Sequence, residues 1–237
     1  MGELWNQAKE NLSFVAVCIV IIAALAILAR LSERFWIQKR QVSPAKRVSV
    51  VAVCAAIAAI LHILDFPLLF LAPEFYKLDF SELPVMLCGF YLGPSAAVAC
   101  EAVKIVLKLL LKGTSTAFVG DFANFAVGCS MVLPAAIIYH LHKSRKGAIV
   151  GLVIGTVILT VFGSAFNAIY LLPKFSQLYG IPLDSIIAMG SKINGSIHSI
   201  STFVLLAVAP LNLIKGIMIS VLTILLYKRI VRPLCGK

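Results

Sequence analysis

Charged side chains are scarce in this sequence. Only 13% of the 237 residues are charged, whereas 61% are hydrophobic. An ordinary soluble domain carries charges at about a quarter of its positions, so this composition excludes that class. Several apolar runs have the length of about twenty residues that a helix needs to cross a bilayer. The chain is therefore predicted to be an all-α integral membrane protein.

Sequence motifs that would power transport or perform catalysis are also missing. There is no GxxxxGK[ST] phosphate loop, no HExxH and no GxSxG. The six cysteines are scattered, without CxxC or Cys/His spacing, so no metal site is predicted. Glu101 and Asp121 are nearly the only acids expected within the membrane, and a self-powered transporter usually needs more, or internal repeats. These absences favour a binding subunit that takes its energy from other proteins.

Basic residues outnumber acidic ones, which gives a net charge of +11. Nucleic-acid binding is one interpretation of such a charge, but much of it lies in short clusters that follow apolar runs. Clusters of this kind mark the cytoplasmic side of a membrane protein. Those at 30–47, 140–146 and 228–237 predict an outside N-terminus, a cytoplasmic C-terminus and no nucleic-acid partner.

The apolar runs predict seven spans, if two short runs joined by Gly93 and Pro94 form a hairpin. Residues 1–47 are expected to form an extra N-terminal transmembrane helix with a basic cytoplasmic linker. Residues 48–237 are expected to form a six-helix domain. Its loop at 67–83 is apolar enough to fold back as a cap, Pro173 should end the sixth run, and 174–201 should be external. The runs are 12–31, 48–66, 84–92, 95–111, 118–141, 148–172 and 203–227.

Lys215 lies near the middle of the last apolar run, where a lysine costs roughly 2.5–3.5 kcal/mol unless it faces a partner or a wet cavity. Asn212 is three residues earlier and shares its helix face. The pair either forms a structural hydrogen bond to a neighbouring helix or anchors a small ligand inside the bundle. Glu101 and Lys104, also three apart, can form an ion pair.

Four further charges are assigned to the protein surface. Lys108 and Lys112 are expected to extend to the outer surface rather than to bind a ligand. Asp79 and Glu82 are acids three apart in the loop that precedes residue 84. They could chelate a metal ion, but no third ligand is evident, so solvation is the favoured interpretation.

Small residues repeat at four-residue spacing in the run 48–66. Ala52 and Ala56 form one such pair, and Ala55 and Ala59 form another. A stripe of small side chains lets a second helix approach closely within lipid. That helix belongs either to another subunit or to this chain's own bundle.

Four motifs in order resemble those of riboflavin-specific substrate-binding subunits, or S components, of energy-coupling factor (ECF) transporters. They are KLDFSELP at 77–84 followed by GFYLGP at 89–94, EAVK at 101–104, GDFANF at 120–125, and PLNLIKG at 210–216. The resemblance runs from about residue 48 to residue 234. The helix at 12–31 lies outside the six-helix pattern, and 174–201 is longer than the family needs.

The resemblance implies a six-helix S-component bundle that binds riboflavin near the extracellular side, under the first loop, and has no cofactor. It implies a transmembrane coupling subunit and two cytoplasmic ATPase subunits as partners, with the alanine stripe meeting the coupling subunit. A flavin needs apolar walls and a few directed polar groups. The residues expected to contact the ligand are Asn124, Asn167, Asn212 and Lys215, backbone groups near Leu78 and Asp79, and the rings of Phe80, Phe122 and Phe166. Those expected to meet the coupling subunit are Ala52, Ala56 and Ala59.

Other functions stay open at this point. The same architecture could serve another vitamin, such as folate, thiamine or a nicotinate. An intramembrane enzyme could use Lys215 and Asn212 with Asp121 or Glu101, although no nucleophile–base or metal set is evident. A purely structural helical subunit would leave the central lysine without a purpose.

Overall fold

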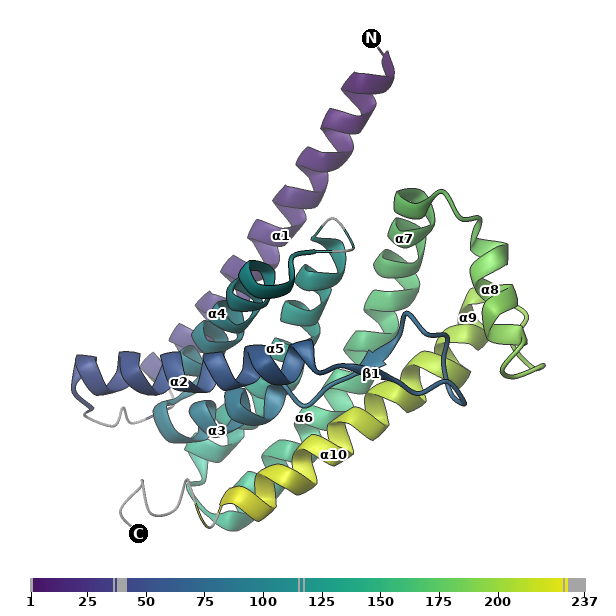
Figure 1. The fold of residues 1–237 in the computed structure, drawn as a ribbon. Coiled ribbons are helices and arrows are strands. Elements are labelled where there is room, and N and C mark those ends of the chain that lie inside the picture. The colour runs from purple at the N-terminus through teal and green to yellow at the C-terminus, as the bar shows by residue number, and fades with distance from the viewer. Residues whose placement is uncertain are drawn as a thin grey trace.

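Helices make up most of the chain in this computed structural model, which describes residues 2–35, 37, 42–114, 116, 118–227 and 229 (Figure 1). The predicted all-α class is confirmed, and the described strands form one short pair. In chain order the elements are α1 (Gly2–Phe35), α2 (Pro44–Ile63), β1 (Phe66–Pro67), β2 (Lys77–Leu78), α3 (Glu82–Leu92), α4 (Pro94–Lys112), α5 (Val119–Leu141), α6 (Arg145–Phe166), η1 (Asn167–Leu171), α7 (Leu172–Tyr179), α8 (Leu183–Ser191), α9 (Ile200–Phe203), η2 (Val204–Val208) and α10 (Ala209–Tyr227).

Five of the described helical segments are long and apolar enough to cross a membrane. The predicted count of seven spans stays a prediction. The helix α3 has 11 residues, which is about 16 Å and shorter than a hydrocarbon layer of about 30 Å. The helix α4 is longer, but it carries Glu101 and three lysines. The five segments are Ala16–Phe35, Pro44–Ile63, Val119–Leu141, Arg145–Gln177 and Ile200–Tyr227.

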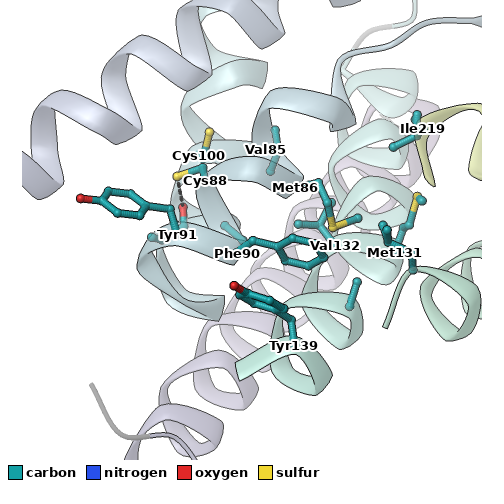
Figure 2. Packing of buried hydrophobic residues seen from close by; sticks show 14 of the residues in the cluster. Val85, Met86, Cys88, Phe90, Tyr91, Cys100, Met131, Val132, Tyr139 and Ile219 are labelled. Atoms are coloured by element: carbon teal, nitrogen blue, oxygen red, sulfur yellow. Dashed lines mark hydrogen bonds between the residues drawn. The ribbon is translucent and has the colours of Figure 1, made fainter. Parts of the chain in front are cut away.

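The short helix α3 lies at the centre of the core. Figure 2 shows its Met86 and Phe90 among side chains of α5. The Phe90 ring stacks on Tyr139 with centroids 4.5 Å apart. The predicted turn after α3 is confirmed, since Gly93 adopts φ 113° and Pro94 opens α4. Only glycine adopts such a backbone angle without strain.

Pro173 does not end the sixth run, so that prediction is wrong. The helical segment continues from α6 through the π turn η1 into α7 and ends at Gly180, which adopts the left-handed conformation. A π turn locally changes the hydrogen-bonding pattern and so accommodates a residue without an N–H group. A second π turn, η2, precedes Pro210 in the same way. Part of the stretch 174–201 is therefore helical, as α7 and α8.

The extra helix α1 packs along α4 and α5, and its N-terminal end extends beyond the rest of the bundle (Figure 1). Ile21, Leu25 and Ala29 face the apolar side chains of those two helices. Near the end of α1, a carboxylate oxygen of Glu33 accepts hydrogen bonds from Ser95 N (2.8 Å) and Ser95 Oγ (2.6 Å). This acid caps the start of α4, where exposed backbone N–H groups favour negative charge. The domain boundary at residue 48 stays a prediction.

The loop between β1 and β2 covers one end of the bundle, as the predicted cap would. The two strands pair antiparallel, with Phe66 opposite Leu78. Between them, Ala72 is fully buried, and Tyr76 packs on Phe203 with ring centroids 6.0 Å apart. The loop therefore has its own apolar contacts with the start of the last helical segment.

The alanine stripe of α2 divides between two faces. Ala52 and Ala56 are exposed, whereas Ala59 is 1% exposed and Ala55 is fully buried. Ala59 shares the inner face with Ala55 and Ala58, because residues three and four apart lie on one side of a helix. The prediction that Ala59 meets a partner is therefore corrected, since its own bundle covers it.

Candidate ligand cavity

A cavity of about 440 Å³ lies beneath the loop between β1 and β2. Side chains from α2, α4, α5, η1, α7 and α10 line it together with that loop. Its volume falls within the range of about 300–1,000 Å³ that is usual for small-molecule sites. Its apolar lining includes Phe75, Val127, Leu171, Phe175 and Leu211.

The structure brings five of the residues predicted to contact the ligand to this one cavity. Asn167 reaches it from η1, and Asn212 and Lys215 reach it from α10. Asp79 follows β2, and Asn124 lies one turn into α5. Residues from four separate parts of the sequence therefore converge, as the predicted ligand set requires.

The other four predicted residues are not among the described residues that line the cavity. Leu78 belongs to β2 and is buried opposite Phe66, and Phe80 faces the Phe66 ring at 6.1 Å. Phe122 and Phe166 meet edge to face at 6.5 Å within the apolar cluster that α1 covers. Both rings pack in a cluster with α1, and their expected place as walls of the ligand site stays a prediction.

Lys215 is only 8% exposed and forms ion pairs with two acids. Its Nζ lies 3.1 Å from Asp79 Oδ2 and 3.0 Å from a carboxylate oxygen of Glu82. The expectation that these acids are solvated is wrong, because Asp79 is 3% and Glu82 2% exposed. A buried ammonium needs such counter-charges. Lys215 therefore enters the cavity wall as a fixed hydrogen-bond donor whose charge is already compensated.

A second lysine extends this buried cluster away from the cavity. Lys104 is fully buried, forms the predicted ion pair with Glu101, and lies 3.5 Å from Glu82. Its Nζ also donates to Ser81 Oγ at 3.0 Å. Gly128 of α5 makes room for these acids, since a Cβ there would overlap the Glu101 carboxylate. The cluster thus joins α3, α4 and α10 beneath the ligand site.

Asp79 has partners on both carboxylate oxygens. Oδ1 accepts from Ser81 N at 2.8 Å, and Oδ2 lies 3.3 Å from His62 Nδ1 as well as close to Lys215. Burial alone would raise the pKa of Asp79, but Lys215 and then His62 hold the pKa of this carboxyl well below its usual range. Asp79 is therefore a carboxylate that fixes the position of the lysine.

The two asparagines differ in how many of their side-chain hydrogen-bonding atoms have a partner within the protein. Asn167 donates from Nδ2 to Gly163 O at 2.8 Å and accepts from the Tyr76 hydroxyl at 2.7 Å. Asn212 is 7% exposed, and its Nδ2 has no hydrogen-bond partner within the described residues. A buried donor without a partner is costly, so Asn212 is the amide that most needs a ligand.

Lys108 and Lys112, which the sequence interpretation placed at the outer surface, both line the cavity. Lys108 lies 2.5 Å from Asp121 Oδ1, and its side chain is only 13% exposed, so the prediction that it extends to the surface is wrong. The predicted surface position fits Lys112, whose side chain is 42% exposed and pairs with Asp65 at 3.3 Å. The short turn between α4 and α5 brings Lys108 and Asp121 together, although they are 13 residues apart in sequence. A lysine and an acid on either side of a short turn are the signal that could have predicted this ion pair.

Metal binding receives no support from this arrangement. Among the described residues, no group of three or more histidine, cysteine, aspartate or glutamate side chains could hold a metal ion. The polar wall consists instead of amides, ion-paired lysines and carboxylates around an apolar space. This combination suits an uncharged ligand that has both an apolar body and polar groups.

The family follows from a comparison with known proteins. The family model for the ECF transporter substrate-specific component matches residues 46–227. The chain belongs to this family. Its members are S components of transporters, not enzymes, so this S component is a membrane protein that works with an ECF module.

Individual relatives agree with the family match. This S component is 33% identical to the riboflavin transporter FmnP of Bacillus subtilis (strain 168), over 77% of its own length and 90% of the relative. It is 35% identical to the riboflavin transporter RibU of Staphylococcus aureus (strain TCH60), over 78% and 90% of the two chains. A solved S component of a bacterial ECF transporter superposes with a TM-score of 0.61 and 36% identity, over 79% and 96%. In this chain α1 precedes the segment that matches the family.

Proposed function

We propose that this S component binds riboflavin in the cavity and supplies it to an ECF module for uptake. The observation that carries the proposal is the extent of similarity to proteins named as riboflavin transporters, which reaches 33–35% identity over 90% of their length. The resemblance of four sequence motifs points the same way. Folate, thiamine and nicotinate are then the alternative ligands against which riboflavin is tested.

The chemistry of the cavity supports a flavin. A flavin ring is a flat apolar body, and the cavity offers Phe75, Phe175 and Leu211 as apolar lining. The polar edge of the ring consists mainly of carbonyl oxygens and ring nitrogens that accept hydrogen bonds. Asn212 Nδ2 and Lys215 Nζ are donors beside that space. The site therefore provides donors where the ring needs them.

The membrane orientation proposed for this chain follows from the end at which the cavity lies. Arg47 donates to Ser95 Oγ at 2.6 Å, which brings the start of α2 to the start of α4. Lys112 at the other end of α4 donates to Ile63 O at the end of α2. The cavity is at the Lys112 end, opposite the basic cluster at 30–47, which supports a cavity that opens outside and a cytoplasmic C-terminus.

The proposed partners are a transmembrane coupling subunit and two cytoplasmic ATPases. The phosphate-loop motif is absent from this sequence, so ATP hydrolysis must come from other chains. The exposed alanines Ala52 and Ala56 provide a surface on which a second helix can pack closely in lipid. This pair is the proposed contact with the coupling subunit.

The test is a titration of the purified protein in detergent, stripped of any bound chromophore, with quenching of flavin fluorescence as the signal. We expect saturable one-to-one quenching that an excess of folate, thiamine or nicotinate does not reverse. Cooperative unfolding shows that the purified protein is folded. If such protein does not quench flavin fluorescence, riboflavin is excluded as the ligand. Co-purification of ATPase subunits from the native membrane tests the partners separately.

A further inference from the structure

A second hollow lies against the loop between β1 and β2. It is an open groove of about 640 Å³ between that loop and α8 (Figure 1), and it shares Phe75 and Lys77 with the cavity. Leu69, Met189 and Ile193 give it an apolar floor. The groove is therefore a separate surface at the same end of the bundle as the cavity, and the covering loop contributes to both.

The groove is apolar although it is open to the outside of the molecule. Leu69, Phe75 and Met189 are all exposed. Phe70, beside Leu69 in the same loop, is 76% exposed. A contiguous exposed apolar surface marks a site that contacts a membrane or a bound molecule. For a chain that crosses a bilayer, the acyl chain of a lipid is the apolar partner at hand.

The place of the groove along the chain puts it at the edge of the bilayer. Leu69 follows shortly after the end of the segment Pro44–Ile63, which is long and apolar enough to cross a membrane. Ile193 precedes the start of another such segment, Ile200–Tyr227. Hydrocarbon gives way to lipid headgroups where such segments end. The groove therefore lies at the depth of the lipid phosphates.

Lysines stand at the groove where they can face a phosphate. Lys192 is exposed and forms no ion pair within the described part of the chain. Lys77 Nζ lies 3.3 Å from Asp65 Oδ1, but Asp65 also pairs with Lys112 at 3.3 Å, so one acid serves two lysines. Glu74 is the acid among the described residues of the groove lining. Lysines outnumber acids in this region, and the surplus positive charge favours an anionic lipid.

We propose that the groove binds an anionic phospholipid. The phosphate lies between Lys77 and Lys192. One acyl chain lies along Leu69, Met189 and Ile193. A phospholipid supplies both the anion and the apolar chain, whereas inorganic phosphate supplies only the anion. The bound lipid joins α8 to the loop that covers the cavity. This site does not depend on which vitamin the cavity holds, so the inference goes beyond the proposed function.

The test is native mass spectrometry of the full chain, purified in detergent and freed of lipid, with phosphatidylglycerol as the probe. We expect one tightly bound lipid, preferred over phosphatidylcholine with the same acyl chains and not displaced by inorganic phosphate. Lys192→Met should weaken its binding at least about fivefold, the effect of one lysine beside an anionic lipid. Met189→Glu should weaken it as much, because the new carboxylate repels the phosphate and removes part of the apolar floor.

Thermal unfolding gives a second measurement of the same site. A molecule that binds the folded state raises its melting temperature. Phosphatidylglycerol should therefore raise the melting temperature of the wild type more than that of either variant. Without lipid, both variants should melt at the wild-type temperature, which shows that they are folded.

The matched control is Lys146→Met, at an exposed lysine in the first turn of α6, at the opposite end of the bundle from the cavity. It should bind phosphatidylglycerol as the wild type does. The proposal is overturned if Lys192→Met and Met189→Glu keep full affinity, or if phosphatidylcholine binds equally well. Displacement by inorganic phosphate would also overturn it, since the apolar floor would then contribute nothing. Failure of the wild type to bind riboflavin would count against the proposed function alone.

Discussion

Lys215 Nζ lies 3.1 Å from Asp79 Oδ2, although 136 residues separate the two in sequence. The ion pair connects the last helix to the loop that covers the cavity. It also means that the lysine in the predicted ligand set has a structural partner as well as a position in the wall. The contact to a neighbouring helix, one of the two interpretations of Lys215, is seen in its ion pair with Glu82 of α3, and the ligand anchor stays a prediction.

Replacing Lys215 with methionine should affect binding and stability together. The variant loses a donor to the ligand, so riboflavin affinity should fall at least about tenfold. It also leaves Asp79 and Glu82 buried without their cation, and breaking such a pair costs about 3–5 kcal/mol. Fluorescence titration and thermal unfolding of the same detergent preparation measure the two effects. Lys192→Met, at an exposed lysine, is the matched control. Unchanged riboflavin affinity would remove Lys215 from the site.

Gly163→Ala should weaken ligand binding with little loss of stability. A Cβ at this position would lie 2.7 Å from Asn212 Nδ2 and must displace that amide. The end of a side chain can move at low cost, so the fold should tolerate the change. The displaced Nδ2 no longer has the position from which it can donate to the ligand. We expect riboflavin affinity to fall about tenfold.

Gly195→Ala is the control for this substitution, since a Cβ there meets no described atom within 4 Å. It should leave affinity and melting temperature unchanged. Full affinity in Gly163→Ala would mean that Asn212 does not contact riboflavin. A large drop in melting temperature with normal affinity would likewise contradict the role given to Asn212.

The sequence predicted the helical fold well because lipid imposes strong limits. Backbone groups in a bilayer must bond within the segment, so long apolar runs are helices. The cost of a central charge identified Lys215, and four short motifs identified the family. Pro173 misled the prediction, because a π turn is a local adjustment that the apolar pattern does not reveal.

The cavity was harder to predict for a different reason. Asp79 and Glu82 precede or begin a short helix, and nothing in their local sequence indicates that a lysine more than 130 residues away lies against them. Whether Phe122 faces a ligand or another helix depends on where α1 docks, which is a long-range property. Residue type thus predicted which polar and charged side chains are unusual for a membrane helix, but not which partners they have in the fold.

Lys104→Met should destabilise the protein strongly, because Glu101 and Glu82 would stay buried without this ammonium. The expected loss is about 3–5 kcal/mol. Adding Glu101→Gln should recover part of it, since one uncompensated charge is then removed. The melting temperatures of the wild type, both single variants and the double variant form a thermodynamic cycle. Additive effects would contradict a direct Lys104–Glu101 interaction.

Substitutions in α2 should separate partner binding from folding. Ala56 is exposed, so Ala56→Phe should leave riboflavin binding and melting temperature unchanged but prevent close approach of the coupling subunit. Ala59 is buried, so Ala59→Phe should overpack the bundle and cost about 1–3 kcal/mol. Val161→Phe, at an exposed position of α6, is the control for a larger surface side chain. Co-purification with the ECF module and thermal unfolding give the two measurements. Normal assembly of Ala56→Phe would direct the search to another face, since a phenyl ring at a close helix contact cannot be accommodated without separating the two backbones.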